Sequence, residues 1–315
     1  MSARASADSH IWEASTEGRA PKVQLQQDGC LSAEQVDRFH RDGFLVIEDF
    51  ATTSEVQDLR QRAQELVENF DPATRSVFST KSQATTTDQY FLESGNNISF
   101  FFEENAFQED GNLRQDKALS INKIGHALHD ADPIFRRFSR SQKVAQLVQS
   151  LGLKRPLPVQ SMYIFKQPKI GGEVRPHQDS TFLYTDPPSV VGLWWALEDA
   201  TRTNGCLWAA PGSHAKGVAR RFLRTPGDKV AFDKDVDYLQ LFNEDEFVPL
   251  EVPSGSLVLL HGANVHFSYE NQSGKSRHAY SMHVIEGAPS HKYLPDNWLQ
   301  RTENFQFEPL DCAST

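Results

Sequence analysis

The C-terminal half of the chain consists of short apolar runs that are separated by turn-forming residues. Seven runs rich in apolar, β-branched or aromatic residues follow Pro158, and they cover residues 159–165, 190–197, 206–210, 246–252, 256–261, 265–269 and 277–286. Runs of this length between Gly, Pro, Asn and Asp residues predict β-strands. Many short strands in succession are typical of a sandwich or barrel. The pattern therefore predicts a mainly β protein whose helices lie in the N-terminal half.

The first elements are predicted from local start and stop signals. Ser32 followed by Gln35 has the pattern of a capping box, which predicts the start of a helix. Gly43 predicts the end of that helix. Residues 44–50 predict a buried strand, and apolar side chains at three- and four-residue steps predict a second helix over residues 54–70. Residues 1–28 are polar and have no period, so they predict a disordered tail before a single domain of residues 29–315.

The segment between residues 71 and 157 carries mixed signals. Residues 71–87 predict a loop, and residues 90–92 and 98–103 predict short strands. A helix is predicted to begin after Ser120 and to hold Lys123, His126 and His129. Two more helices are predicted, one over residues 141–151 and one that begins at Pro133, because proline suits the first helical position.

Charge and composition exclude several classes of protein. The net charge of −10 argues against a nucleic-acid partner. No apolar run approaches the roughly 20 residues that a membrane-spanning helix needs. The three cysteines are too few and too scattered for a disulfide framework. We therefore expect a cytoplasmic protein without a signal peptide, a membrane contact or a C-terminal peroxisomal signal.

The string HQD at residues 177–179 is a candidate metal-binding motif. Side chains two residues apart in an extended strand point to the same side, so His177 and Asp179 can reach one cation. One further histidine completes a 2-His-1-carboxylate triad, which leaves coordination positions of Fe(II) open. The candidates in the C-terminal half are His214, His261, His266, His278, His283 and His291. We prefer His266, which lies in VHFS just past a strongly apolar strand.

Arg277 is a candidate ligand for a carboxylate. It opens the string RHAYSMHV, and alternation along a strand places Arg277, Ala279, Ser281 and His283 on one face. A guanidinium group donates two parallel hydrogen bonds to a carboxylate and stays charged at any working pH.

Five strings resemble, in order and spacing, the phytanoyl-CoA dioxygenase family of Fe(II)/2-oxoglutarate oxygenases. They are QSMYIFKQP, GGEVRPHQD, LWWALEDATRTNGCLW, PGSH and LLHGANVHFSYENQSGKSRHAYSMHV, and the resemblance extends over about residues 30–300. Within the family they are more similar to the group of domain-containing proteins than to phytanoyl-CoA hydroxylase itself. The resemblance implies a double-stranded β-helix, a jelly-roll or cupin-like core with helices packed outside.

The resemblance also implies roles for individual residues. The iron ligands match His177, Asp179 and His266, since the distal ligand is the second histidine of HGANVH. Arg277 matches the arginine that binds the far carboxylate of 2-oxoglutarate, with Ser268 as a second contact. The positions that line the cosubstrate pocket match Lys123, Met162 and Trp195.

The implied reaction uses Fe(II), 2-oxoglutarate and O2, with ascorbate as a candidate reductant. It hydroxylates a C–H bond of an unidentified small molecule and releases succinate and CO2. Two alternatives remain open, namely a sensing module that binds iron and 2-oxoglutarate with little turnover, and a metal-dependent hydrolase on the same barrel. A carboxylic acid and a CoA thioester are both candidate substrates, and Arg220, Arg221 and Arg224 form the compact basic group that could meet CoA phosphates.

Overall fold

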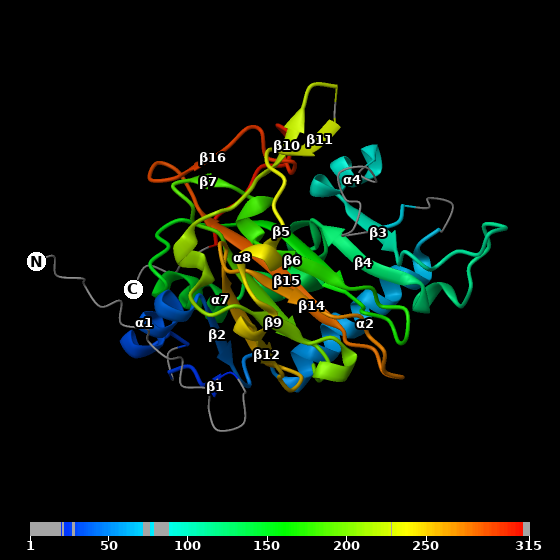
Figure 1. Cartoon of the computed structure of the whole chain (residues 1–315), viewed down its shortest axis with the longest axis horizontal. Coiled ribbons are helices and arrows are strands. Elements are labelled where there is room, and N and C mark those ends of the chain that lie inside the picture. The colour runs from blue at the N-terminus through cyan, green and yellow to red at the C-terminus, as the bar shows by residue number, and fades with distance from the viewer. Residues whose placement is uncertain are drawn as a thin grey trace, which may run out of the picture.

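Two multi-stranded sheets pack face to face in the computed structural model, which describes residues 20, 22–26, 29–71, 76–78, 88–227 and 229–310 (Figure 1). The larger sheet has the strand order β1 (Lys22–Val23), β2 (Phe44–Ile47), β13 (Leu257–His261), β8 (Val191–Ala196), β15 (Ala279–Glu286), β5 (Pro156–Ile164), β4 (Ile121–His126) and β3 (Ile98–Phe102). The smaller sheet has the order β12 (Val248–Leu250), β9 (Leu207–Ala209), β14 (His266–Ser268) and β6 (Val174–His177). The two sheets thus form the two walls of a jelly-roll.

Most neighbouring strands run antiparallel, and β1 pairs with β2 in parallel. Two short ribbons flank the sheets, one made by β10 (Phe222–Thr225) and β11 (Lys229–Phe232), the other by β7 (Thr185–Asp186) and β16 (Lys292–Tyr293). The helices are α1 (Ala33–Asp42), α2 (Thr53–Asn69), α4 (Gln89–Glu93), α5 (Leu128–Ala131), α6 (Pro133–Ser139), α7 (Gln142–Ser150) and α8 (Tyr238–Leu241).

The larger sheet is buried on both faces, and alternation decides which side chains face which layer. Trp194 and Ala196 of β8 join the apolar cluster between the two sheets. Leu193 and Trp195 point the other way, into a second cluster that α2, α6 and α7 cover with side chains such as Leu59, Phe135 and Leu147. The pocket that holds the candidate site lies in the layer between the two sheets, where both sheets contribute side chains.

Local signals at the first helix are confirmed by the structure. The hydroxyl of Ser32 accepts a hydrogen bond from the backbone N–H of Gln35, and the Gln35 side chain accepts one from the backbone N–H of Ser32. Gly43 ends the helix with φ at +79°, a conformation that glycine adopts at little cost. The helix over 54–70, the helix at Pro133, the helix over 141–151 and the strands predicted in the C-terminal half are also present.

Two predictions between residues 88 and 130 are wrong. Residues 90–92 belong to helix α4, whose first turn is capped by the Asp88 carboxylate, which accepts a hydrogen bond from the Phe91 N–H. The segment after Ser120 is strand β4, not a helix, because β4 pairs with β3 on one side and β5 on the other. The Ser120 hydroxyl donates to the backbone oxygen of Asp116 instead of capping a helix. Lys123 therefore lies on a strand.

Part of the predicted N-terminal tail takes part in the fold. Residues 22 and 23 pair with Val46 and Ile47 as strand β1, so the tail prediction is too long at this point. Residues 1–19, 21, 27 and 28 lie outside the described residues, as do 72–75 and 79–87 of the predicted loop. Among the helices that the structure describes, none is both long and apolar enough to cross a membrane.

Candidate active site

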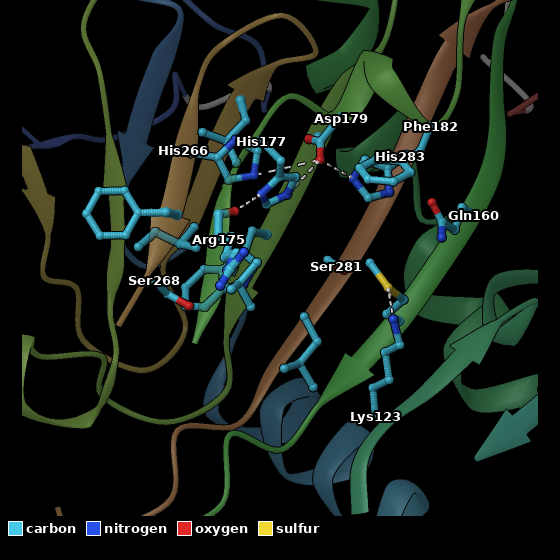
Figure 2. Close-up of a pocket in the computed structure, with 18 of the residues that line it drawn as sticks. Lys123, Gln160, Arg175, His177, Asp179, Phe182, His266, Ser268, Ser281 and His283 are labelled. Atoms are coloured by element: carbon cyan, nitrogen blue, oxygen red, sulfur yellow. Dashed lines mark hydrogen bonds and ion pairs between the residues drawn. The ribbon is translucent and has the colours of Figure 1, made fainter. Parts of the chain in front are cut away.

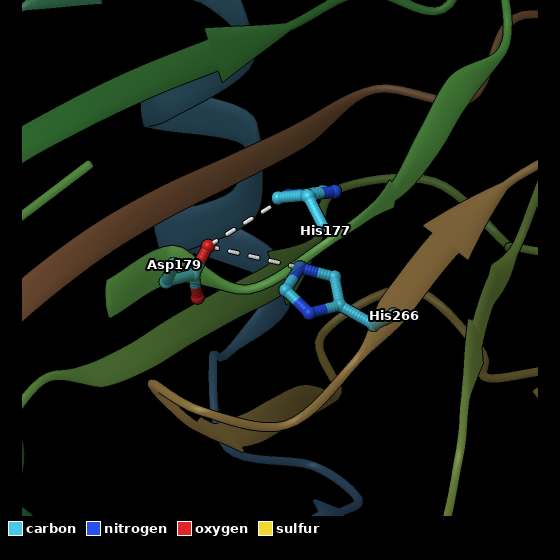
Figure 3. A group of neighbouring side chains, drawn as sticks. All are labelled: His177, Asp179 and His266. Atoms are coloured by element: carbon cyan, nitrogen blue, oxygen red, sulfur yellow. Dashed lines mark ion pairs between the residues drawn. The ribbon is translucent and has the colours of Figure 1, made fainter. Parts of the chain in front are cut away.

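Three predicted ligands converge at one end of the smaller sheet. His177 is the last residue of β6, Asp179 opens the following turn, and His266 begins β14 directly opposite His177 in the register. The Oδ1 atom of Asp179 lies 3.8 Å from His177 Nε2 and 3.7 Å from His266 Nε2 (Figure 3). One ligand atom from each of the three residues lies within 4.8 Å of the others, which is close enough for all three to hold a single metal ion.

Backbone carbonyl groups orient both histidine rings. His177 Nδ1 lies 2.8 Å from the backbone oxygen of Arg175, and His266 Nδ1 lies 3.2 Å from that of Asn264. A carbonyl oxygen only accepts hydrogen bonds, so each Nδ1 carries the proton and each Nε2 keeps its lone pair toward Asp179. The two imidazoles are thus held in the tautomer that a metal ligand needs.

The electrostatics of His177 and Asp179 favour the protonation states that metal binding needs. Burial and the neighbouring His266 lower the pKa of His177 to about 3, so its imidazole is neutral near pH 7. Burial opposes the ionisation of Asp179, but the attraction of His283 and His266 outweighs it and holds the pKa of this carboxyl below its usual value. Metal ligands must be deprotonated, and His177 and Asp179 already are.

His261 does not take part in this group. Its Nδ1 atom accepts a hydrogen bond from the Ala263 N–H at 3.1 Å, and its ring lies 4.7 Å from that of His214. The structure therefore places the second histidine of the HGANVH string, His266, beside Asp179.

A third histidine lies beside Asp179, and the sequence offered it among the candidates for the second histidine ligand. His283 on β15 is buried, and its Nε2 atom lies 3.2 Å from Asp179 Oδ1, closer than either predicted ligand. It does not belong to the group of atoms within 4.8 Å of one another. Ser281 and His283 both line the pocket (Figure 2). The sequence predicted that they share a strand face with Arg277, and this shared face could have identified His283 as a residue of the site.

The triad lies in the wall of a cavity of about 180 Å³ between the two sheets (Figure 2). Its lining carries a marked excess of positive charge. Asp179 is the acidic residue among the lining residues that the structure describes, whereas the basic ones are Lys123, Lys166, Arg175, Arg220 and Arg277. The pocket is therefore suited to an anionic ligand.

Arg277 and Lys123 are buried cations without a carboxylate partner in the described part of the chain. Arg277 is 1% exposed, its Nε donates to the Gly205 backbone oxygen at 3.1 Å, and its Nη1 makes no hydrogen bond within the described residues. Lys123 Nζ lies 3.2 Å from the centre of the Phe78 ring and 3.8 Å from Met162 Sδ. Burial lowers the pKa of Lys123 well below its usual value. Isolated buried charges are costly, so both residues fit a site that takes up an anion.

Comparison with known proteins decides the family. Residues 39–279 match the family model described as phytanoyl-CoA dioxygenase (PhyH). The chain is 54% identical to a phytanoyl-CoA dioxygenase of Arabidopsis thaliana over 87% of its length and 95% of the relative. The chain belongs to the phytanoyl-CoA dioxygenase family. It is also 49% identical to phytanoyl-CoA dioxygenase domain-containing protein 1 of Bos taurus, over 89% of this chain and 99% of that one.

Solved structures confirm the predicted fold of this phytanoyl-CoA dioxygenase family member. EctD from S. alaskensis in its apoform superposes with a TM-score of 0.59 at 20% identity, over 92% of this chain and 88% of that one. The epimerase SnoN from nogalamycin biosynthesis gives a TM-score of 0.58 at 14% identity, over 90% and 96% of the two chains. The double-stranded β-helix and the predicted enzyme class, a 2-oxoglutarate-dependent dioxygenase, are thereby confirmed.

The family resemblance assigned Trp195 to the cosubstrate pocket, and the structure places it elsewhere. Trp195 is fully buried in the outer core layer, where its ring stacks on Tyr280 at 5.6 Å. Trp194, its neighbour on the other face of β8, lines the pocket, and its ring lies 5.1 Å from the guanidinium carbon of Arg277. Successive side chains of a strand point to opposite faces, so a one-residue difference moves the indole out of the site.

The remaining predicted residues of the cosubstrate site lie in the pocket. Ser268 is the last residue of β14, and Met162 and Lys123 lie on β5 and β4 of the other sheet (Figure 2). Ser268 Oγ already accepts a hydrogen bond of 2.8 Å from Lys166 Nζ, a residue that the sequence did not indicate.

The three arginines considered for CoA phosphates do not form a cluster. Arg221 forms an ion pair with Asp296, and Arg224 Nε donates to the Trp298 backbone oxygen at 2.7 Å. Arg220 lines the pocket, where its guanidinium carbon lies 3.9 Å from the centre of the Phe232 ring. A single arginine of the three is thus turned toward the site.

Proposed function

We propose that this protein binds Fe(II) through His177, Asp179 and His266 and uses 2-oxoglutarate and O2 to hydroxylate a C–H bond of a small molecule. The observation that carries the proposal is the convergence of the three ligand atoms in the wall of a pocket. The same pocket holds two buried basic side chains, Lys123 and Arg277, that have no carboxylate partner among the described residues. Two imidazoles and one carboxylate are the donor set of non-haem Fe(II) oxygenases. EctD with bound Fe and SnoN with Fe3+ and alpha-ketoglutarate are solved neighbours of this fold.

When bound, the metal and 2-oxoglutarate supply the oxidative decarboxylation to succinate and CO2 and the hydroxylation coupled to it. The chain supplies ligands, charge and orientation. Arg277 is anchored through Nε on the Gly205 oxygen and has Nη1 free to donate to the far carboxylate of the cosubstrate. Lys123 adds a second basic group, which can take up a proton when an anion binds, and Trp194 shields the face of the Arg277 guanidinium from water.

The pocket also has features suited to a substrate with an apolar body. Phe182 lies next to His177, with 6.2 Å between the ring centres, and packs against Phe232. Arg220 lies over Phe232 and has no ion-pair partner among the described residues. A small carboxylic acid, with its acid group at Arg220 and its apolar part along Phe182 toward the metal, satisfies both features. A CoA thioester fits less well, because Arg221 and Arg224 are already engaged.

The test is anaerobic loading with Fe(II) and 2-oxoglutarate, followed by succinate release when O2 is admitted with ascorbate present. Native protein should bind both and release succinate slowly without a prime substrate. Asp179→Ala should lose metal binding, and Arg277→Ala should bind the metal but need at least tenfold more 2-oxoglutarate, since a charged hydrogen bond contributes roughly 1.5–3 kcal/mol. Tight binding without any succinate would favour the sensing module. Failure of the native protein to bind either ligand would refute the proposal.

A further inference from the structure

Lys166 is a buried lysine beside the cosubstrate end of the pocket. It is 2% exposed and lies two residues after β5, with a left-handed backbone conformation of φ +42°. Its backbone oxygen accepts hydrogen bonds from Asn271 Nδ2 at 2.9 Å and from the Arg277 N–H at 3.3 Å. Left-handed φ values are unfavourable for a residue with a side chain, so the surrounding hydrogen bonds hold Lys166 in place.

The side chain of Lys166 determines whether the Ser268 hydroxyl donates or accepts hydrogen bonds. Lys166 Nζ donates to the Gly172 backbone oxygen at 2.7 Å and to Ser268 Oγ at 2.8 Å. In this geometry Ser268 Oγ accepts the hydrogen bond from Lys166 Nζ, so the hydroxyl keeps its own hydrogen for another partner. The structure gives that hydrogen no acceptor among the described residues, and Ser268 lines the pocket.

Gly205 packs against the side chains of both Lys166 and Arg277. A Cβ atom on Gly205 would lie 2.6 Å from Lys166 Cε, so a side chain there is excluded, and the Gly205 backbone oxygen accepts from Arg277 Nε. Burial and the nearby Arg277 lower the pKa of Lys166 well below its usual value, although the carboxylates of Glu103 and Glu173 oppose this shift. No carboxylate within the described residues forms an ion pair with Lys166 or with Arg277. Two adjacent buried cations are costly unless an anion lies between them.

We propose that Lys166 is a positioning residue for the far carboxylate of the 2-oxo acid cosubstrate. It holds Ser268 Oγ so that the hydroxyl donates into the pocket beside Arg277, toward the second carboxylate of the cosubstrate. The site thereby selects a five-carbon 2-oxo dicarboxylate over the matching monocarboxylate. This inference rests on the proposed use of 2-oxoglutarate at the His177, Asp179 and His266 site.

The test compares two ligands that differ only at the far end. Protein loaded with Co(II) under anaerobic conditions is titrated by calorimetry with 2-oxoglutarate and with 2-oxopentanoate, which has a methyl group in place of the far carboxylate. Lys166→Met should weaken 2-oxoglutarate binding by roughly tenfold or more, in line with the loss of charged hydrogen bonding. It should leave the affinities for 2-oxopentanoate and Co(II) within twofold of the native values.

Ser268→Ala provides the second variant. It should weaken 2-oxoglutarate binding to a similar degree, and the double variant should lose less than the sum of the two, because the lysine acts through the serine. Unchanged 2-oxoglutarate affinity in Lys166→Met would overturn the inference, and so would an equal loss for both ligands or a loss of Co(II) binding. A native protein that binds neither ligand would instead refute the proposed function, so the two failures are distinct.

Discussion

His283 Nε2 lies 3.2 Å from Oδ1 of Asp179, the same oxygen that faces His177 and His266. A carboxylate accepts hydrogen bonds, so the His283 Nε2–H fixes the carboxylate from the side opposite the two ligand histidines. The other ring nitrogen, Nδ1, is buried and makes no hydrogen bond within the described residues. His283 therefore orients the carboxylate of a predicted metal ligand.

Removal of this partner should weaken metal binding. His283→Leu is expected to lower Co(II) affinity by about 10- to 100-fold, the usual cost of losing an outer partner of a metal ligand. His283→Gln places an amide N–H near the position of Nε2 and should recover most of the affinity. Titration of the metal-free protein with Co(II) measures both. Equal affinities for the Leu and Gln variants would show that the hydrogen bond has no such role.

Gly192 provides a steric test of the same carboxylate. A Cβ atom there would lie 2.7 Å from Asp179 Oδ2 and 3.4 Å from Leu260 Cβ. Gly192→Ala should therefore displace the Asp179 side chain and reduce Co(II) affinity at least tenfold, while circular dichroism stays native. Gly274→Ala is the matched control, since a Cβ atom there meets nothing within 4 Å. An unchanged affinity in Gly192→Ala would contradict the placement of Asp179.

The two tryptophans of β8 should have separable effects. Trp195→Ala removes a fully buried ring and is expected to lower the free energy of unfolding by about 3–5 kcal/mol. The variant that remains folded should bind 2-oxoglutarate normally. Trp194→Leu removes the ring beside Arg277 and should weaken 2-oxoglutarate binding several-fold, given about 0.5–2 kcal/mol for such a contact. Urea denaturation measures the change in stability, and calorimetry measures 2-oxoglutarate binding. Weaker 2-oxoglutarate binding in Trp195→Ala with normal binding in Trp194→Leu would show that Trp195, not Trp194, lines the pocket.

The metal-free protein should lose stability in mild acid, and His261 should account for part of the loss. Burial, with His214 and His40 nearby, lowers the pKa of His261 to about 4 in the folded state, against 6.5 in the unfolded chain. Between these values the unfolded chain binds a proton that the folded protein excludes. Stability is therefore full above pH 6.5 and falls by up to about 1.4 kcal/mol per pH unit for this group as the pH drops toward 4.

Denaturation curves of native protein and His261→Gln between pH 5 and 7.5 check this expectation. In the variant, the free energy of unfolding should fall less steeply as the pH drops, and the difference in slope should correspond to nearly one bound proton. The Co(II) affinity at pH 7.5 should be unchanged, because His261 is not one of the predicted ligands. An identical pH dependence in the two proteins would contradict the assignment.

Features that depend on neighbouring residues were predictable from the sequence. The Ser32 and Gln35 cap, the Gly43 stop and the succession of C-terminal strands all follow from local patterns that the structure confirms. The pair His177 and Asp179 was recognisable because a two-residue spacing is itself local.

Features that depend on pairing between distant segments were not predictable in the same way. Lys123 is in the pocket as expected, but on a strand, because β3 and β5 decide the conformation of its segment. Trp194 and Trp195 differ only in which face of β8 they occupy, and the register with β15 determines that face. The contact between Lys166 and Ser268 joins residues 102 positions apart, and no spacing rule indicates it.

The fate of molecular oxygen tests the central claim most directly. The proposed reaction consumes 2-oxoglutarate, O2 and a C–H bond and yields succinate, CO2 and an alcohol, so one oxygen atom of O2 enters succinate and the other enters the alcohol. Fe(II)-loaded native protein given 2-oxoglutarate under 18O2 should release succinate with one 18O atom, as mass spectrometry can detect, and Asp179→Ala should release none. Succinate without the label, or no succinate from native protein that has bound both Fe(II) and 2-oxoglutarate, would contradict the account.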